Sequence, residues 1–211
     1  MATRSTPGYA VSGAVVVICS RHCLVRRNGA GDLQLGEKYV VTISDFLLTD
    51  HMLLRYCNVD FIVLATLIGV MLLRIVLTYD IACQWSKNFR KRMEEFPPEM
   101  QILEATRVDV AVPGWHINGH SESCRNNFNL SYMEGAARTV GEDVETIWAG
   151  TNPLAPSVHE MGPAARHDTL NDHWNGWNFR KVVRFRVFFF VVLCSSILIN
   201  IFRHLASEAL Q

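Results

Sequence analysis

The stretch Arg74–Gln84 constrains the fold most, because a short apolar run within it ends on a single acidic residue, Asp80. Residues 75–79 are rich in β-branched and aromatic side chains and are too few for a typical helix, which predicts a buried strand. A carboxylate at the carboxyl end of such a strand is held rigidly and still reaches solvent, which suits a Mg²⁺ ligand. The position equally suits an Asp that only caps a helix or lines a loop.

The residues before this strand are apolar enough to allow two interpretations. Asn58 is a plausible helix N-cap, and residues 61–67 form an apolar helix body that ends near Gly69. Hydropathy alone would join residues 61–77 into one membrane span, but Arg74 interrupts the run. An arginine near the bilayer centre costs about 2.5–3.5 kcal/mol on the insertion scale. We therefore expect a buried helix followed by a core strand, with a membrane span as the alternative.

Two basic runs follow patterns typical of helices. Residues 83–96 alternate apolar and basic positions at near-helical spacing before Pro97 and Pro98, which predicts one amphipathic helix. Basic runs are usually solvated faces, but they can also contact the phosphates of DNA. Because 20 basic and 20 acidic residues cancel over the chain, overall charge gives no case for nucleic acid. The two runs are Lys87, Arg90, Lys91 and Arg92, and Arg180, Lys181, Arg184 and Arg186.

Histidine and cysteine gather after a second predicted strand, at residues 107–112. His116, His120 and Cys124 are spaced by four, and Cys83 could supply a fourth ligand. Imidazole and thiolate are good zinc ligands, so this group is a candidate Zn²⁺ site. A hydrogen-bonded polar loop is the alternative. The earlier Cys19-x-x-x-Cys23 with His22 is a weaker candidate, because two thiols and a mispositioned imidazole do not complete a tetrahedral site.

A second acidic candidate follows in residues 141–151. Glu142 and Glu145 are three residues apart, with Trp148 three further on, so one face of a helix could present both carboxylates to a metal ion. The alternative is an N-terminal helical turn in which acids complement the helix dipole.

The order and spacing of these segments resemble the Kyakuja-Dileera-Zisupton (KDZ) transposases over about residues 17–185. The resemblance implies an α/β fold, namely a partial RNase H-like transposase core with an inserted Cys/His loop and a helical C-terminal part. It also implies an Asp-Asp-Glu triad that holds Mg²⁺ ions for phosphoryl transfer on DNA, and a nuclear location. The segments that carry it are Tyr79–Trp85, Val112–His116, Gly119-His120, Gly141–Glu145 with Trp148, Asn152-Pro153, Met161–Pro163 and Arg166–Trp174.

Residue by residue, the resemblance makes Asp80 the second acid of the triad and Glu142 or Glu145 the third. The first acid is expected upstream of Cys19, where this sequence has neither Asp nor Glu. We therefore expect a degenerate fragment without catalytic activity. A DNA-binding remnant that uses the basic residues, such as Lys87, Arg90, Lys91, Arg180, Lys181 and Arg184, is one alternative class.

The sequence also predicts a division of the chain. Residues 1–39 are an N-terminal remnant with the Cys/His segment, 40–56 a non-homologous insertion, 57–185 the partial core and 186–211 a hydrophobic tail. The insertion and the tail are hypothesised to be translated noncoding sequence. Because residues 187–202 are long and apolar enough to approach a membrane span, a small membrane protein with spans at 61–77 and 187–202 is the other alternative class.

Overall fold

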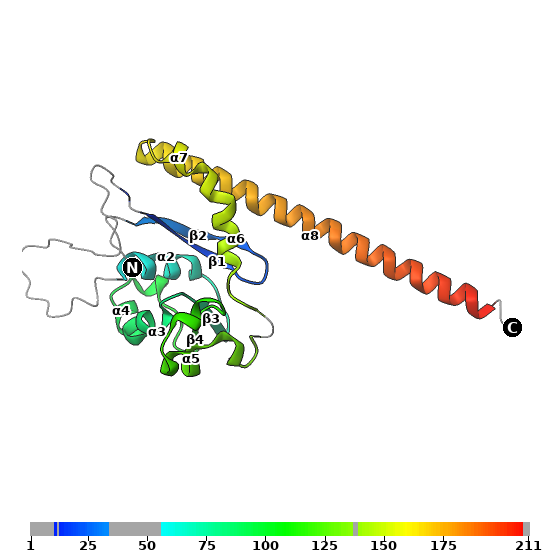
Figure 1. Cartoon of the computed structure of the whole chain (residues 1–211), viewed down its shortest axis with the longest axis horizontal. Helices are drawn as coiled ribbons and strands as arrows, with labels where there is room; N and C mark the ends of the chain where they lie inside the picture. Colours follow the sequence, from blue (N-terminus) through cyan, green and yellow to red (C-terminus); the bar gives the residue numbers. More distant parts are fainter. Residues whose placement is uncertain (1–10, 12, 34–55, 137–138, 209–211) are drawn as a thin grey trace, which may run out of the picture. The chain divides into compact units, whose positions relative to one another are not determined.

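The computed structural model describes residue 11 and residues 13–33, 56–136 and 139–208, with side chains up to residue 185. The chain divides into two compact units, Met1–Asn152 and Pro153–Gln211 (Figure 1). Most of the predicted insertion at residues 40–56 lies outside the described residues. The division into four segments therefore stays a prediction.

The first unit begins with an antiparallel hairpin of β1 (Gly13–Cys19) and β2 (Leu24–Leu33). The register slips between Val16 and Ile18, which marks a β-bulge. The tight turn after β1 places Cys23 at a φ of 53°, a conformation that non-glycine residues seldom adopt. The hairpin packs on helix α2 (Cys57–Leu67), so that this helix is covered on one side by strands.

After α2 the chain turns at Gly69, whose φ of +74° favours glycine, and enters β3 (Arg74–Thr78). Strand β3 pairs in parallel with β4 (Arg107–Ala111), in the register Arg74↔Arg107 to Thr78↔Ala111. The prediction of a helix followed by a core strand is therefore confirmed, and a single membrane span over residues 61–77 is wrong. Arg74 is accommodated because it pairs with Asp109 on β4 and donates to the Glu134 carbonyl.

None of the helices whose side chains are described is long and apolar enough to cross a bilayer. The predicted tail at residues 187–202 continues the backbone of helix α8 (Pro163–Glu208), with side chains outside the described set. The membrane alternative therefore gains no support from the structure.

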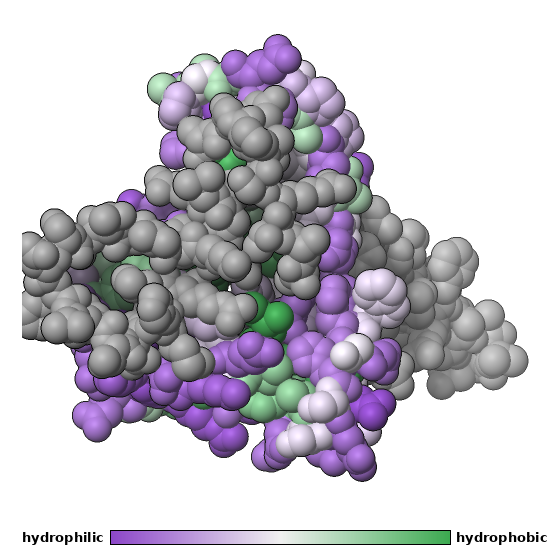
Figure 2. Space-filling model, turned by 60° about the vertical axis from the view of Figure 1, so that its left-hand side comes forward, coloured by the Kyte–Doolittle hydropathy of each residue, from purple (hydrophilic) through white to green (hydrophobic). Residues whose placement is uncertain are grey.

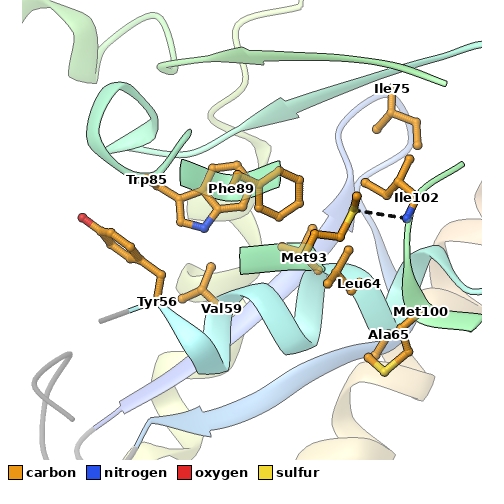
Figure 3. Packing of buried hydrophobic residues seen from close by; sticks show 11 residues of the cluster. Tyr56, Val59, Leu64, Ala65, Ile75, Trp85, Phe89, Met93, Met100 and Ile102 are labelled. Carbon is orange, nitrogen blue, oxygen red and sulfur yellow. Dashed lines mark hydrogen bonds between the residues drawn. The ribbon is translucent and has the colours of Figure 1, made fainter. Parts of the chain in front are cut away.

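The predicted amphipathic helix at residues 83–96 is divided into three short pieces. These are α3 (Ala82–Trp85), the 3₁₀ turn η1 (Ser86–Asn88) and α4 (Phe89–Met93). Their apolar side chains pack against α2 and against β3, together with residues from the following loop (Figure 3). The core cluster contains Tyr56, Val59, Val63, Leu64, Ala65, Ile75, Trp85, Phe89, Met93, Met100 and Ile102.

One residue of the first basic run is part of this core. Arg92 is only 3% exposed and donates from Nε to Asp60 Oδ2 at 2.5 Å, while Asp60 itself is fully buried. Asp60 also accepts a hydrogen bond of 2.7 Å from Trp85 Nε1. Burial raises the pKa of the Asp60 carboxyl, and the hydrogen bonds from Arg92 and Trp85 oppose that rise. Arg92 is thus not on a solvated face.

The rest of the first unit carries α5 (Glu122–Phe128) and α6 (Asp143–Thr151), with 3₁₀ turns η2 (Pro98–Met100), η3 (His116–Gly119) and η4 (Leu130–Tyr132). The second unit holds α7 (Ala155–Val158) and the long helix α8, preceded by the 3₁₀ turn η5 (Asn152–Leu154). Its described buried residues include Val158, Leu170 and Trp174.

The fold is therefore mixed α/β, as predicted. Its described strands lie in two separate two-stranded sheets. Hydrophilic side chains cover most of the described surface on the face shown in Figure 2, and hydrophobic ones gather in smaller areas. The helical C-terminal part is also present.

Candidate active site and metal-ligand cluster

Asp80 lies where the sequence predicts, just beyond the carboxyl end of β3. The backbone continues the β3–β4 pairing one step further, because Tyr79 donates its N–H to the Ala111 carbonyl at 3.1 Å. Since β3 and β4 are parallel, the segments that follow them leave the sheet at the same edge. The Asp80 side chain is 37% exposed, so it is accessible to an ion or a ligand.

His116 joins Asp80 to Glu142. Its Nε2 lies 3.7 Å from Asp80 Oδ2, and its Nδ1 lies 3.1 Å from Glu142 Oε2. The imidazole therefore lies between two carboxylates that are far apart in the sequence. We predicted His116 as a member of the candidate zinc group, but in the structure it lies beside Asp80 and Glu142.

The loop around Glu142 explains how this acid reaches the site. Gly141 has a φ of +81°, and a Cβ there would lie 3.1 Å from Leu130 Cδ2, so both conformation and space favour glycine. Gly114 donates its N–H to the Val140 carbonyl at 2.9 Å, and Trp115 donates its N–H to Glu142 Oε1 at 2.8 Å. These bonds hold the segment before α6 against the segment after β4.

Glu142 and Glu145 do not form the predicted pair on one helical face. Helix α6 begins at Asp143, so Glu142 is the residue just before it, and its carboxylate contacts His116. Glu145 lies in the first turn of α6 and is exposed. Helix α6 begins one residue after Glu142, which is enough to change the relation between the two carboxylates.

Cys83, His120 and Cys124 form the second cluster. Their ligand atoms all lie within 4.8 Å of one another, and Cys83 Sγ is 3.5 Å from His120 Nδ1. Burial raises the pKa of the Cys83 thiol, and the neighbouring Cys124 thiol raises it further. Three of the four predicted zinc ligands are therefore together, and this group could bind a metal such as Zn²⁺.

The elements that carry these ligands are short and lie close to the acids in sequence. Cys83 is in α3, three residues after Asp80, and His120 follows η3, four residues after His116. Cys124 is in the first turn of α5, where its N–H donates to the N-cap Ser121 Oγ at 3.5 Å. Asp80 and Cys83 thus lie on the segment after β3, and His116 and His120 lie on the segment after β4.

The Cys19, His22 and Cys23 segment contacts the start of α6. Cys23 donates its thiol hydrogen to the Asp143 carbonyl at 3.4 Å, and Ser20 Oγ donates to Asp143 Oδ2 at 3.1 Å. Within the described residues this segment does not belong to a group of three close ligand atoms. Its contacts instead connect the β1–β2 turn with the residue after Glu142.

The basic residues proposed to contact DNA differ in their surroundings. Lys87, Arg90 and Lys91 are exposed, and Arg90 Nη2 donates to the Thr106 carbonyl at 3.1 Å. On α8, Arg180 and Arg184 are exposed, and Lys181 Nζ lies 5.2 Å from the centre of the Trp177 ring. Their contact with DNA stays a prediction.

Sequence reasoning missed His116 as the partner of the acids and Arg92 as a core residue. Asp80 and His116 each follow a predicted strand within a few residues, so a parallel pairing of these strands was the signal that could have joined them. Arg92 is seven residues after the buried Trp85, a spacing that puts both on one helical face.

The comparisons with known proteins give one match. The family model of the Kyakuja-Dileera-Zisupton transposase matches residues 51–178, which is more than half of the chain. The N-terminal resemblance from about residue 17 lies outside that match. No curated protein and no solved structure matches the chain. The matched range holds the acids, His116 and the Cys83 cluster, and the chain belongs to the KDZ transposase family.

Proposed function

We propose that the chain carries part of a DDE-type transposase site, in which Asp80 and Glu142 hold a divalent cation against a DNA phosphodiester. The observation that carries the proposal is the arrangement of Asp80, His116 and Glu142, in which one imidazole lies 3.7 Å from one carboxylate and 3.1 Å from the other. Family membership supplies the class of reaction, and an RNase H-like core is the corresponding proposal for the fold.

The donor chemistry fits a hard cation only in part. Carboxylate oxygens are the protein ligands that Mg²⁺ prefers, and both acids are accessible to solvent in part. A two-metal site needs a further carboxylate to bridge the ions. Among the described residues, the ligand atoms of Cys83, His120 and Cys124 all lie within 4.8 Å of one another, and those of Asp80, His116 and Glu142 do not form such a group. We therefore propose that these 211 residues alone do not cleave DNA.

Glu142 is the better candidate for the third acid of the triad. Its carboxylate contacts His116 and the backbone N–H of Trp115, so its position is fixed by two partners. Glu145 is exposed one turn later in α6. Substitution of Glu145 therefore serves as a matched control for substitution of Glu142.

The experiment is DNA binding measured with Ca²⁺, which supports metal-bridged binding without requiring cleavage. We expect Ca²⁺ to strengthen binding to the wild-type chain, and we expect Asp80→Asn with Glu142→Gln to abolish that gain while Glu145→Gln preserves it. A gain that survives in the double variant would contradict the site. Mg²⁺-dependent strand cleavage that is lost in Asp80→Asn would contradict the proposed inactivity.

We further propose that Cys83, His120 and Cys124 supply three of the ligands of a Zn²⁺ site. The distance of 3.5 Å between Cys83 Sγ and His120 Nδ1 is close to the ~3.5 Å expected between two ligands of a tetrahedral zinc ion, given Zn–S of about 2.3 Å and Zn–N of about 2.0 Å. When bound, the ion would fix α3 to the segment after η3. Because Asp80 is just before Cys83 and His116 is just before His120, the bound ion would also hold Asp80 and His116 in position.

DNA is the corresponding partner, and a nuclear location is the corresponding proposal for a chain that binds chromosomal DNA. Both are consistent with the family, whose members act on DNA as transposases. The exposed basic residues of η1, α4 and α8 are the proposed phosphate contacts. If Lys87 and Lys91 contact phosphates, DNA binding should fall steeply with salt, and Lys87→Ala with Lys91→Ala should make that salt dependence shallower. An unchanged salt dependence would exclude this role for η1 and α4.

A further inference from the structure

Trp115 is a large aromatic side chain left in solvent at the candidate active site. It is 74% exposed, whereas Trp85 in the core is 1% exposed. Leaving an indole in water forgoes most of the stabilisation that burial of its apolar surface would give. Trp115 directly precedes η3, and the buried residue of that turn is Ile117.

The position of Trp115 is fixed although its side chain is exposed. Its own N–H donates to Glu142 Oε1 at 2.8 Å, and the preceding Gly114 is bonded to the Val140 carbonyl. On the other side, Ile117 donates its N–H to the Pro113 carbonyl at 3.0 Å. The backbone of Trp115 is therefore attached to the same carboxylate that takes part in the acid site.

The indole also lies next to the imidazole that joins the two acids. The rings of Trp115 and His116 have centroids 5.4 Å apart and planes at 86°, an edge-to-face arrangement. One residue thus contributes a backbone donor to Glu142 and an exposed ring beside His116. A phosphodiester bound at Asp80 and Glu142 would therefore bring the adjoining nucleotide close to the Trp115 ring.

We propose that Trp115 stacks on an unpaired nucleobase next to the phosphodiester at the acid site. This inference rests on the proposed function and adds the form of DNA that the site takes. Inside a continuous duplex both faces of each base are covered by neighbours, so an indole can stack only on a base at an unpaired end or one displaced from the helix. The site is therefore selective for DNA with an unpaired nucleotide over fully paired DNA.

The test compares two DNA probes of one sequence in Ca²⁺ buffer, a blunt duplex and the same duplex with one unpaired base in its middle. Base stacking on an aromatic side chain predicts that Trp115→Ala weakens binding of the second probe by about fivefold to a hundredfold and leaves the blunt duplex unchanged. Trp115→Phe retains most of the preference, because a smaller ring still stacks.

The matched control is Tyr132→Ala, which removes an aromatic side chain that is also 74% exposed. We expect it to bind both probes as the wild type does. Equal binding of both probes by the wild type, or a wild-type preference in Trp115→Ala, would overturn the stacking role. If the wild type binds neither probe, both the stacking role and the proposed function fail. If the Trp115 variants bind as the wild type does, while Asp80→Asn with Glu142→Gln loses the gain in binding with Ca²⁺, only the stacking role fails.

Discussion

Asp60 and Asp80, both in the first unit, each contact a basic side chain, but the two carboxylates differ in how deeply they are buried. Asp60 is fully buried and is held by Arg92 and by the indole N–H of Trp85, with donor–acceptor distances of 2.5–3.1 Å. Asp80 is 37% exposed, and its Oδ2 lies 3.7 Å from His116 Nε2. The Asp60 carboxylate is hydrogen-bonded to protein donors, whereas the Asp80 carboxylate remains able to bind an ion or another ligand.

The difference in burial separates a structural ion pair from a candidate functional contact. A buried charge is stable only when its partners replace the water it has lost, so Asp60 and Arg92 must remain paired. A half-exposed carboxylate incurs a smaller desolvation cost and need not be fully satisfied. The contrast predicts that substitutions at Asp60 affect folding, whereas substitutions at Asp80 affect ligand binding.

The largest expected effect is from breaking the buried pair. We expect Asp60→Ala to lower the free energy of unfolding by about 3–5 kcal/mol, because it leaves the Arg92 guanidinium buried without a carboxylate. Chemical denaturation monitored by tryptophan fluorescence measures the change. Asp80→Asn is the matched control and should stay within about 0.5 kcal/mol of the wild type.

A joint substitution sharpens this prediction. Replacing both partners by apolar residues, as in Asp60→Leu with Arg92→Met, removes the unpaired charge and should recover much of the stability lost in Asp60→Ala. If Asp60→Ala and Asp80→Asn destabilise the chain equally, the distinction between the two carboxylates is wrong.

The second effect in size concerns the Cys83, His120 and Cys124 cluster. Free Zn²⁺ at a hundred times its dissociation constant should stabilise the folded chain by about 2.7 kcal/mol, and a chelator should remove that gain. We expect Cys124→Ser to lose the bound zinc and the thermal shift, as measured by metal analysis and thermal unfolding. Cys57→Ser, at an exposed cysteine, is the control and should keep both.

A result in which Cys57→Ser and Cys124→Ser bind the same amount of zinc would show that the cluster is not the site. It would also weaken the view that the segment after His116 is fixed by a metal ion.

The smallest effect comes from an ion pair of intermediate burial. Asp109 is 18% exposed and contacts Arg74 Nε at 2.5 Å and Arg107 Nε at 3.0 Å. Desolvation alone would raise the pKa of the Asp109 carboxyl, but the hydrogen bonds from Arg74 and Arg107 outweigh it and lower the pKa. A lowered pKa gives stability that is present above the ordinary value of 3.8 and is lost as the pH falls through the folded-state value.

We therefore expect Asp109→Asn to reduce the loss of stability between about pH 6 and pH 3 by about 1 kcal/mol or less, as for other partly exposed ion pairs. Denaturation curves at both pH values measure it, and Asp168→Asn, at an exposed residue of α8, is the control. An unchanged acid dependence in Asp109→Asn would mean that this pair contributes nothing measurable.

The sequence alone predicted those parts of the site that depend on local pattern. A short β-branched run predicted strand β3 and the place of Asp80 at its end, and the residue types of Cys83, His120 and Cys124 predicted the three members of the cluster. Residue spacing made Glu142 and Glu145 candidate acids, and the resemblance to the family added the role of a third acid. Each of these features is encoded within a few consecutive residues or within a family motif.

What could not be predicted depends on contacts between distant segments. His116 joins the acids because β3 and β4 are parallel and adjacent, and neither strand reveals its register alone. Arg92 is buried because Asp60 on α2 faces it, whereas its neighbours in the basic run are exposed. The like charges of the run do not by themselves show which member has a buried partner; the spacing of Arg92 from Trp85 is the local signal for it.

The most direct test of the account is a Mn²⁺ titration of the zinc-saturated chain, followed by electron paramagnetic resonance. The wild type should bind Mn²⁺, and Asp80→Asn and Glu142→Gln should each weaken binding by about tenfold or more, since each removes a charged oxygen ligand. Glu145→Gln should bind as the wild type does. Equal affinity in the wild type and in Asp80→Asn, or an effect of Glu145→Gln as large as that of Glu142→Gln, would contradict the proposal that Asp80 and Glu142 share one cation.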